Sequence, residues 1–264
     1  MTTEFETLIV EREAGIVTVT MNRPARKNAA NGTMWRELLE VFDDVATDRH
    51  DRVMVLTGSG GAFCSGADLG DAADVAGRPG DPYLVQMRAL GNVALRLHQI
   101  PKPTIAKVGG VAAGAGMSLA LGCDLVVASE SARFSQIFSK RGLSVDFGAS
   151  WLLPRFIGMH RAKELAFFAD IISAQQAAEF GVVNKVVPDD LLDQAVGEWA
   201  TRLAAGPPLA LSMTKSMLNN SFALSMDQAL EEESRSQAVN FATADTLEAI
   251  AAFTQKRDPV FKGR

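Results

Sequence analysis

A glycine-rich stretch at residues 109–121 places the tightest limit on the fold of this chain, because four of its first eight residues are glycine. The apolar run at 104–108 precedes it and is typical of a buried strand. Small and apolar residues follow, and they predict a helix that ends near Gly122. Glycines at such a turn allow a sharp bend or the close approach of another group. The first N–H groups of the helix are then free, so the turn could hold a phosphate or an oxyanion, or could serve close packing alone.

A second glycine-rich turn, at residues 58–69, has the same setting. It follows the apolar run at 53–57, which predicts another buried strand. In an α/β sheet, turns at the carboxyl ends of the strands line the ligand crevice. Two such turns side by side could direct the backbone N–H groups of Ala67 and Ala115 at one oxygen atom.

The composition is that of a globular protein and argues against several classes of protein, among them nucleic-acid-binding and membrane-spanning proteins. The formal net charge of −5 and the lack of a basic run argue against nucleic-acid binding. No apolar run approaches the ~20 residues of a membrane span, and the acidic start lacks the apolar segment of an export signal, so a cytoplasmic location is expected. Cys64 and Cys123 are expected to be buried free thiols. The three histidines, His50, His98 and His160, are scattered, and no metal site is expected.

Strand and helix patterns alternate over most of the chain and become purely helical near its end. Strands are predicted at 8–13, 16–21, 53–57, 104–108, 125–128, 132–135 and 182–187. Helices are predicted at 34–46, with Asn31 or Thr33 as the cap, at 84–99, from about 150 towards 156, at 161–170, from Ser173 to Gly181, and at 191–204, 208–219, 226–243 and 245–255. The segment from 70 to 83 is predicted to be a mobile surface loop. No internal repeat is visible, and the pattern indicates a parallel α/β core with a helical C-terminal region.

Over essentially its whole length the chain resembles the crotonase superfamily of enoyl-CoA hydratases and isomerases. Its most specific motif is the turn Phe63-Cys64-Ser65-Gly66-Ala67-Asp68-Leu69. The other matching segments are 22–29, 110–116, Cys123-Asp124, Gly142 with Pro154-Arg155, Ser173-Ala174 with 181–183, and 253–262.

This resemblance implies a spiral of repeated ββα turns, with a core at 1–200 and a C-terminal helical trimerisation region at 201–264. It also implies a homotrimer or a hexamer built as a dimer of trimers, and an acyl-CoA thioester as substrate. Coenzyme A is then part of the substrate, and no separate cofactor is expected. By position, the N–H groups of Ala67 and Ala115 polarise the thioester carbonyl. The family usually has glycine at the second of these sites, but alanine keeps the N–H.

Hydratases of this family hold a water molecule between two glutamates, and this chain lacks both. Ser118 occupies the position of the first glutamate and Phe138 that of the second. A serine hydroxyl is too weak a base to act alone, and phenylalanine cannot transfer a proton. Hydration by the two-glutamate route is therefore disfavoured, although whole-chain similarity makes a hydratase label natural.

The remaining acid–base candidate is Asp146, at a position where some isomerase-type relatives carry a functional Asp. A lone carboxylate beside Val145, Phe147 and Phe138 would have a raised pKa. One such residue could move a proton between two carbon atoms, so we expect an enoyl-CoA double-bond isomerase. Three alternatives stay open: Asp146 could only cap the following helix, the enzyme could hydrate by an unconventional route, or the protein could bind acyl-CoA without turnover.

The resemblance also implies which residues contact the substrate. The alternative for the charged ones is that they are ordinary solvent-exposed surface residues. Phe253 and Lys256 match a pair that approaches the nucleotide end of coenzyme A, often from a neighbouring subunit, and the segment 70–83 with Phe138 would shape the acyl pocket. The full set of expected contacts is Arg26, Lys27, Asp68, Leu69, Gly70, Gly114, Ser118, Phe138, Phe253 and Lys256.

Overall fold

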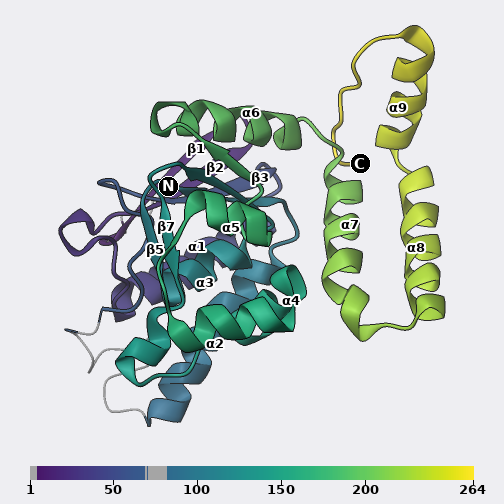
Figure 1. The fold of residues 1–264 in the computed structure, drawn as a ribbon. Coiled ribbons are helices and arrows are strands. Elements are labelled where there is room, and N and C mark those ends of the chain that lie inside the picture. Colours follow the sequence, from purple (N-terminus) through teal and green to yellow (C-terminus); the bar gives the residue numbers. More distant parts are fainter. Residues whose placement is uncertain (1–4, 69, 71–81) are drawn as a thin grey trace.

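The computed structural model describes residues 5–68, 70 and 82–264. Two sheets form the centre of the molecule (Figure 1). The larger sheet has the order β1-β2-β3-β4-β6-β9, and only its β1–β2 pair is antiparallel; the smaller has the order β5-β7-β8. The strands are β1 (Leu8–Glu13), β2 (Ile16–Met21), β3 (Val53–Gly58), β4 (Thr104–Val108), β5 (Val111–Ala113), β6 (Leu125–Ser129), β7 (Arg133–Ser135), β8 (Ile172–Ser173) and β9 (Lys185–Val187).

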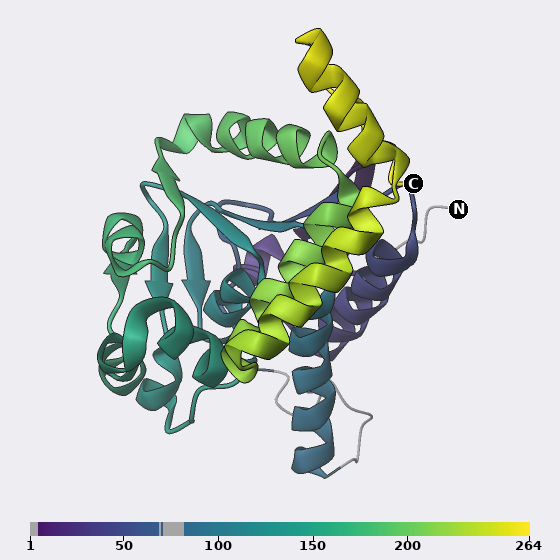
Figure 2. The same ribbon diagram turned by 90° about the vertical axis from the view of Figure 1, so that its right-hand side faces the viewer.

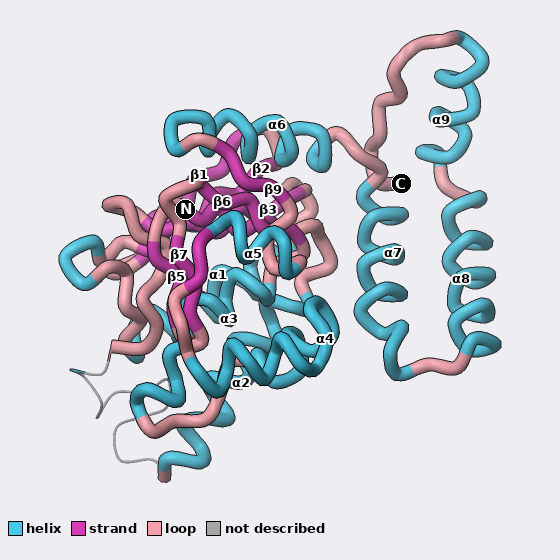
Figure 3. The backbone as a smooth tube through the Cα atoms, viewed as in Figure 1, coloured by secondary structure: helices cyan, strands magenta, loops and turns pink. Residues whose placement is uncertain are grey.

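Helices surround the two sheets, as the tube in Figure 3 shows. The α-helices are α1 (Gly32–Thr47), α2 (Tyr83–Gln99), α3 (Ala115–Gly122), α4 (Ala149–Phe168), α5 (Ala174–Phe180), α6 (Leu192–Ala204), α7 (Pro208–Asn220), α8 (Met226–Phe241) and α9 (Ala244–Gln255). The short 3-10 helix η3 (Ile137–Arg141) lies between β7 and α4. No helix in the described part of the chain is long and apolar enough to cross a membrane.

The chain repeats one path through these elements. It passes through a strand of the larger sheet, then a strand of the smaller sheet, then a helix, as in β4-β5-α3 and β6-β7-η3-α4. After β3, Cys64 makes a parallel bridge with Ala112 and takes the place of the second strand. The expected spiral of ββα turns is thus confirmed, although no repeat is visible in the sequence.

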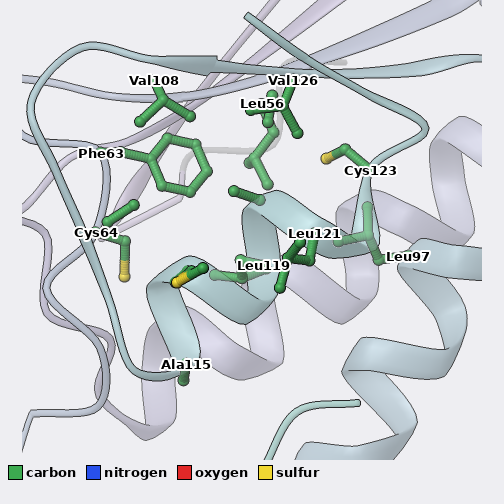
Figure 4. Packing of buried hydrophobic residues seen from close by; sticks show 14 of the residues in the cluster. Leu56, Phe63, Cys64, Leu97, Val108, Ala115, Leu119, Leu121, Cys123 and Val126 are labelled. Atoms are coloured by element: carbon green, nitrogen blue, oxygen red, sulfur yellow. The ribbon is translucent and has the colours of Figure 1, made fainter. Parts of the chain in front are cut away.

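Burial on both sides of the larger sheet explains its apolar strands. Val53 and Val55 of β3 pack with α6, while Met54 and Leu56 belong to the main core on the other face. Helix α3 lies inside that core, and all eight of its residues are buried. Figure 4 shows its side chains among those of the neighbouring strands and of α2. A helix buried on every side has little freedom to move, so α3 is a rigid base for the turn before it.

Most predicted elements are present with small shifts at their ends. The predicted helix after Asn31 begins at Gly32, and Asn31 Oδ1 accepts a hydrogen bond of 3.0 Å from the N–H of Met34. The predicted pair of helices around residue 158 forms the two arms of α4, with a kink at Gly158. Strands β5 and β8 were not predicted, and β9 is shorter than the predicted 182–187 strand. Cys64 and Cys123 are buried and unpaired as predicted, and burial raises the pKa of each thiol to about 12.

The C-terminal helices α7, α8 and α9 stand beside the core rather than within it (Figures 1 and 2). Helices α7 and α8 bury no residue. The contact with the core includes two bonds from α7: Lys215 Nζ lies 2.7 Å from Asp124 Oδ2, and the Asn219 amide donates to the carbonyl of His98 at 3.2 Å. The predicted mobile loop at 70–83 falls mainly on residues 71–81, which lie outside the described residues.

Candidate active site

The two glycine-rich turns lie against each other. The N–H of Cys64 donates to the carbonyl of Val111 at 3.0 Å, and the N–H of Ala113 donates back to the carbonyl of Cys64 at 2.9 Å. A Cβ atom at Gly116 would lie 2.1 Å from the carbonyl oxygen of Cys64, and one at Gly66 would lie 2.9 Å from that of Ala113. These glycines are therefore required by backbone packing between the turns.

The N–H of Ala67 is free because of the way its turn pairs with Ala30. Ala30 donates to the carbonyl of Gly66 at 2.8 Å and accepts from the N–H of Asp68 at 2.9 Å. In this parallel bridge, the residue between the two bonded ones turns its own N–H to the opposite side. The Ala67 N–H accordingly makes no hydrogen bond within the described part of the chain.

The N–H of Ala115 has no hydrogen-bond acceptor among the described residues, because Ala115 is the first residue of α3. Its neighbour Gly114 precedes the helix with φ 54° and ψ −126°, a conformation open to glycine, and its N–H donates to the carbonyl of Ser135 at 2.9 Å. The first N–H of a helix has no acceptor within the helix. A Cβ atom at Gly66 would lie 3.7 Å from the Ala115 nitrogen, so the two free donors come from adjoining backbone segments. Such a pair could bind an oxyanion.

Ser118 and Phe138 lie beside the turn that carries the Ala115 N–H, and neither supplies an acid or a base. The Ser118 hydroxyl is buried and donates to the carbonyl of Gly114 at 3.2 Å. Phe138 lies on η3 and is 6% exposed, and its Cζ atom would be 3.7 Å from a Cβ at Gly114. Phe138 thus forms an apolar wall beside the turn that carries Ala115.

Asp146 is a partly buried carboxylate without a capping role. Gly148 is the N-cap of helix α4, and within the described residues no side chain accepts a hydrogen bond from an N–H group of the first turn. The capping interpretation is therefore wrong; only the backbone carbonyl of Asp146 takes part, accepting from the N–H of Ala149 at 3.1 Å. Within the described residues, Asp146 Oδ1 is buried and has no hydrogen-bond partner. Burial disfavours the charged form and raises the pKa of Asp146 to about 6.

Asp68 and Asn28 shape the turn around Ala67. An oxygen of the Asp68 carboxylate lies 2.9 Å from the guanidinium of Arg23, and the other accepts from the N–H of Gly70 at 3.2 Å. Asn28 is fully buried, and its amide donates to the carbonyls of Ser59 and Ala62, each at 2.8 Å. No local sequence pattern predicts this role of Asn28, since the contacts join segments more than 30 residues apart.

The residues expected to meet coenzyme A fall into two groups. Arg26 and Lys27 are exposed, and their carbonyls accept hydrogen bonds from Ser65, two residues before Ala67, so they lie next to the candidate site. Phe253, which is 87% exposed, belongs to α9, and Lys256 is the C-cap of that helix. Helix α9 stands apart from the core that holds the two turns (Figures 1 and 2). Leu69 lies outside the described residues.

Comparison with known proteins gives one family. The family model for enoyl-CoA hydratase/isomerase matches residues 11–264. Over 260 residues, the chain is 40% identical to the 1,2-epoxyphenylacetyl-CoA isomerase of Escherichia coli (strain K12), covering 98% of this chain and 99% of the relative. Over 259 residues it is 38% identical to the 2,3-dehydroadipyl-CoA hydratase of the same organism, covering 97% and 99%. A crystal structure of an enoyl-CoA hydratase from Bacillus anthracis superposes with a TM-score of 0.92 at 31% identity, covering 98% and 100%.

Proposed function

Since the chain belongs to the enoyl-CoA hydratase/isomerase family and processes an acyl-CoA thioester, we propose that it moves the double bond of an enoyl-CoA through an enolate. One observation carries this choice over hydration. Among the described residues, the buried oxygen of the Asp146 carboxylate has no hydrogen-bond partner, whereas Ser118 and Phe138 leave the two hydratase positions without an acid or base. Burial raises the pKa of Asp146 to about 6, which suits a base that must take up a proton and release it near neutral pH.

In the proposed reaction the substrate is a 3-enoyl-CoA. The ionised carboxylate of Asp146 removes a proton from C2, and the C–H electron pair forms a C1–C2 double bond while the carbonyl oxygen takes the negative charge. The charge then returns from that oxygen: the C1=O bond reforms, C2–C3 becomes the double bond, and the former C3–C4 pair takes the proton from Asp146 at C4. The product is a 2-enoyl-CoA, and the enzyme recovers its starting protonation state.

The N–H groups of Ala67 and Ala115 would bind the thioester oxygen throughout. Two fixed donors stabilise the enolate more than the neutral carbonyl, and each contributes about 3–4 kcal/mol in comparable sites. The buried Phe138 ring keeps water from the side of Gly114, which favours return of the proton to carbon over addition of water.

Hydration is the second candidate because the E. coli relative at 38% identity is a hydratase by name. It requires addition of water across a 2-enoyl-CoA with a single carboxylate, Asp146, serving as both base and acid. The same protein would then act on the product of the preferred reaction.

Substrate assays separate these functions. Purified protein is incubated with a 3-enoyl-CoA and, separately, with a trans-2-enoyl-CoA, and products are followed by ultraviolet absorbance and mass. Formation of the 2-enoyl isomer without a gain of 18 Da, and its loss by about 10²–10⁴-fold in Asp146→Asn, supports isomerisation. Rapid hydration with no isomerisation refutes it, and tight binding without turnover of either substrate identifies a binding protein.

We also propose that coenzyme A enters as part of the substrate, with no separate cofactor, and that the protein works as a homotrimer or hexamer. Arg26 and Lys27, exposed beside the Ala67 turn, would meet the phosphates. Phe253 and Lys256 lie far from the turns of their own chain, and α7 and α8 bury no residue, so a neighbouring copy is the natural partner for this region. Light scattering in solution measures the assembly, and a monomeric mass would contradict it.

A further inference from the structure

No side chain of the described residues holds the buried oxygen of the Asp146 carboxylate by a hydrogen bond, so something else must fix the position of this carboxylate. A base for proton transfer between carbon atoms must nevertheless keep a fixed position relative to the oxyanion donors. Its position must therefore come from the backbone on either side of it and from what that backbone packs against.

The residue after Asp146 is held in a constrained conformation. Phe147 has φ 51° and is followed by Gly148 with φ 81°, so two successive residues occupy the left-handed region. For a bulky residue such as Phe147 this conformation is strained and persists only where packing enforces it. The packing partner is Trp35: the two ring centroids are 5.1 Å apart, and the residues are 4% and 1% exposed.

Trp35 belongs to the first turn of α1, and this turn is also joined to the candidate oxyanion hole. The N–H of Trp35 donates to the carbonyl of Asn31 at 3.1 Å, and Asn31 directly follows Ala30. Ala30 in turn forms the two hydrogen bonds that hold the segment around Ala67. The start of α1 thus joins the two parts of the site: Ala30, just before the helix, holds the segment carrying Ala67, and Trp35, in its first turn, contacts the residue after Asp146.

We propose that Trp35 and Phe147 are positioning residues, and that the first turn of α1 sets the separation between the Asp146 carboxylate and the Ala67 N–H. This inference rests on the proposed function. It assigns a role in catalysis to a buried aromatic pair that would otherwise be counted as core. Neither ring needs to touch the substrate, because each acts through the backbone that it fixes.

A positioning role predicts a specific kinetic pattern. When Trp35 is shortened to Leu, Phe147 loses its partner and the Asp146 loop can shift by a fraction of an ångström. A misplacement of about 1 Å can cost ~10²-fold in rate, so kcat should fall by about 10–100-fold. KM should stay within about threefold of its original value, since the expected coenzyme A contacts are elsewhere. Water that reaches the carboxylate should also move the acidic limb of the pH profile of kcat to lower pH.

The experiment compares four forms of the full-length protein: wild type, Trp35→Leu, Trp35→Phe and Phe42→Leu. Phe42 lies seven residues after Trp35 on α1, is fully buried, and controls for loss of an aromatic ring from the same helix. Thermal unfolding is recorded for each, and kinetics are measured well below every transition. Trp35→Leu should show the reduced kcat and the shifted acidic limb, Trp35→Phe should recover most of the activity, and Phe42→Leu should keep both properties of the wild type.

Two outcomes would overturn the inference: unchanged kcat and pH profile in Trp35→Leu, or an equal loss of kcat in Phe42→Leu. If Trp35→Leu does not fold, Phe147→Leu tests the same contact from the other side. Asp146→Asn separates this inference from the function it rests on. Full activity of that variant removes Asp146 from the reaction, whereas an inactive Asp146→Asn beside a normal Trp35→Leu refutes the positioning role alone.

Discussion

The partly buried carboxylate of Asp146 should lower the free energy of unfolding at neutral pH. The variant Asp146→Asn has an amide that does not titrate, so it should lose this pH-dependent contribution. In the folded chain the pKa is raised from 3.8 to about 6. The folded state therefore binds more protons than the unfolded state between these values, and stability falls as pH rises through this window. Below 3.8 the carboxyl group is neutral in both states and costs nothing as a charge.

The size of the effect follows from the same shift. With 1.36 kcal/mol per pKa unit, the ionised carboxylate costs about 3 kcal/mol at pH 7 and about 1.5 kcal/mol at pH 5. The amide in Asp146→Asn does not titrate. Its own unpaired polar atoms carry a cost of about 1–3 kcal/mol, but that cost is the same at both pH values. The stability of the variant relative to wild type should thus be about 1.5 kcal/mol more favourable at pH 7 than at pH 5.

Urea unfolding at one fixed protein concentration, at pH 5 and pH 7, measures this difference. Asp190→Asn, a change at an exposed carboxylate, serves as the control and should leave the wild-type difference between the two pH values unaltered. If Asp146→Asn is less favourable relative to wild type at pH 7 than at pH 5, the ionised carboxylate is stabilised in the folded state. An unfavourable environment that poises the Asp146 carboxylate for proton transfer would then be excluded.

Three further outcomes are expected. The activity of the wild type should fall about tenfold per pH unit below about pH 6, as Asp146 takes up a proton, and a flat kcat profile from pH 5 to 8 would contradict this. Ala115→Pro should reduce kcat by about 10²–10³-fold with little loss of helix, because proline is tolerated at the first helical position yet lacks the N–H. An unchanged kcat together with a normal circular dichroism spectrum would exclude the Ala115 N–H as a donor. Gly116→Ala should destabilise the protein by several kcal/mol or prevent folding, because the added Cβ would lie 2.1 Å from the Cys64 carbonyl oxygen; a melting temperature equal to wild type would show that the turns can separate.

Features encoded by neighbouring residues were predictable from the sequence. The turns after β3 and β5 show as glycine clusters, and the start of α1 shows as Asn31 before an amphipathic pattern. The resemblance to a known family supplied the spiral and the role of Ala67 and Ala115 as donors to a thioester carbonyl. Strand β5 was missed because three residues between glycines give no periodicity, and it exists through its pairing with β7.

Features that depend on distant contacts were not predictable. A helix cap and a free carboxylate are equally compatible with the sequence around Asp146, and only the backbone path through Phe147 and Gly148 decides between them. The burial of Asn28 against the turn at 58–62, and the contact of Trp35 with Phe147, join segments 31 to 112 residues apart. These contacts form only when the chain folds, so no local sequence pattern predicts them.

The use of main-chain donors has a consequence for how such a protein can change over generations. The N–H groups of Ala67 and Ala115 persist whichever side chain is encoded at these positions, with proline as the exception. Coding changes can therefore exchange the side chains that would move protons, while the proposed pair of main-chain donors is inherited intact. A new reaction can therefore arise when a substitution moves the acid–base carboxylate to another position, while the same intermediate is still formed.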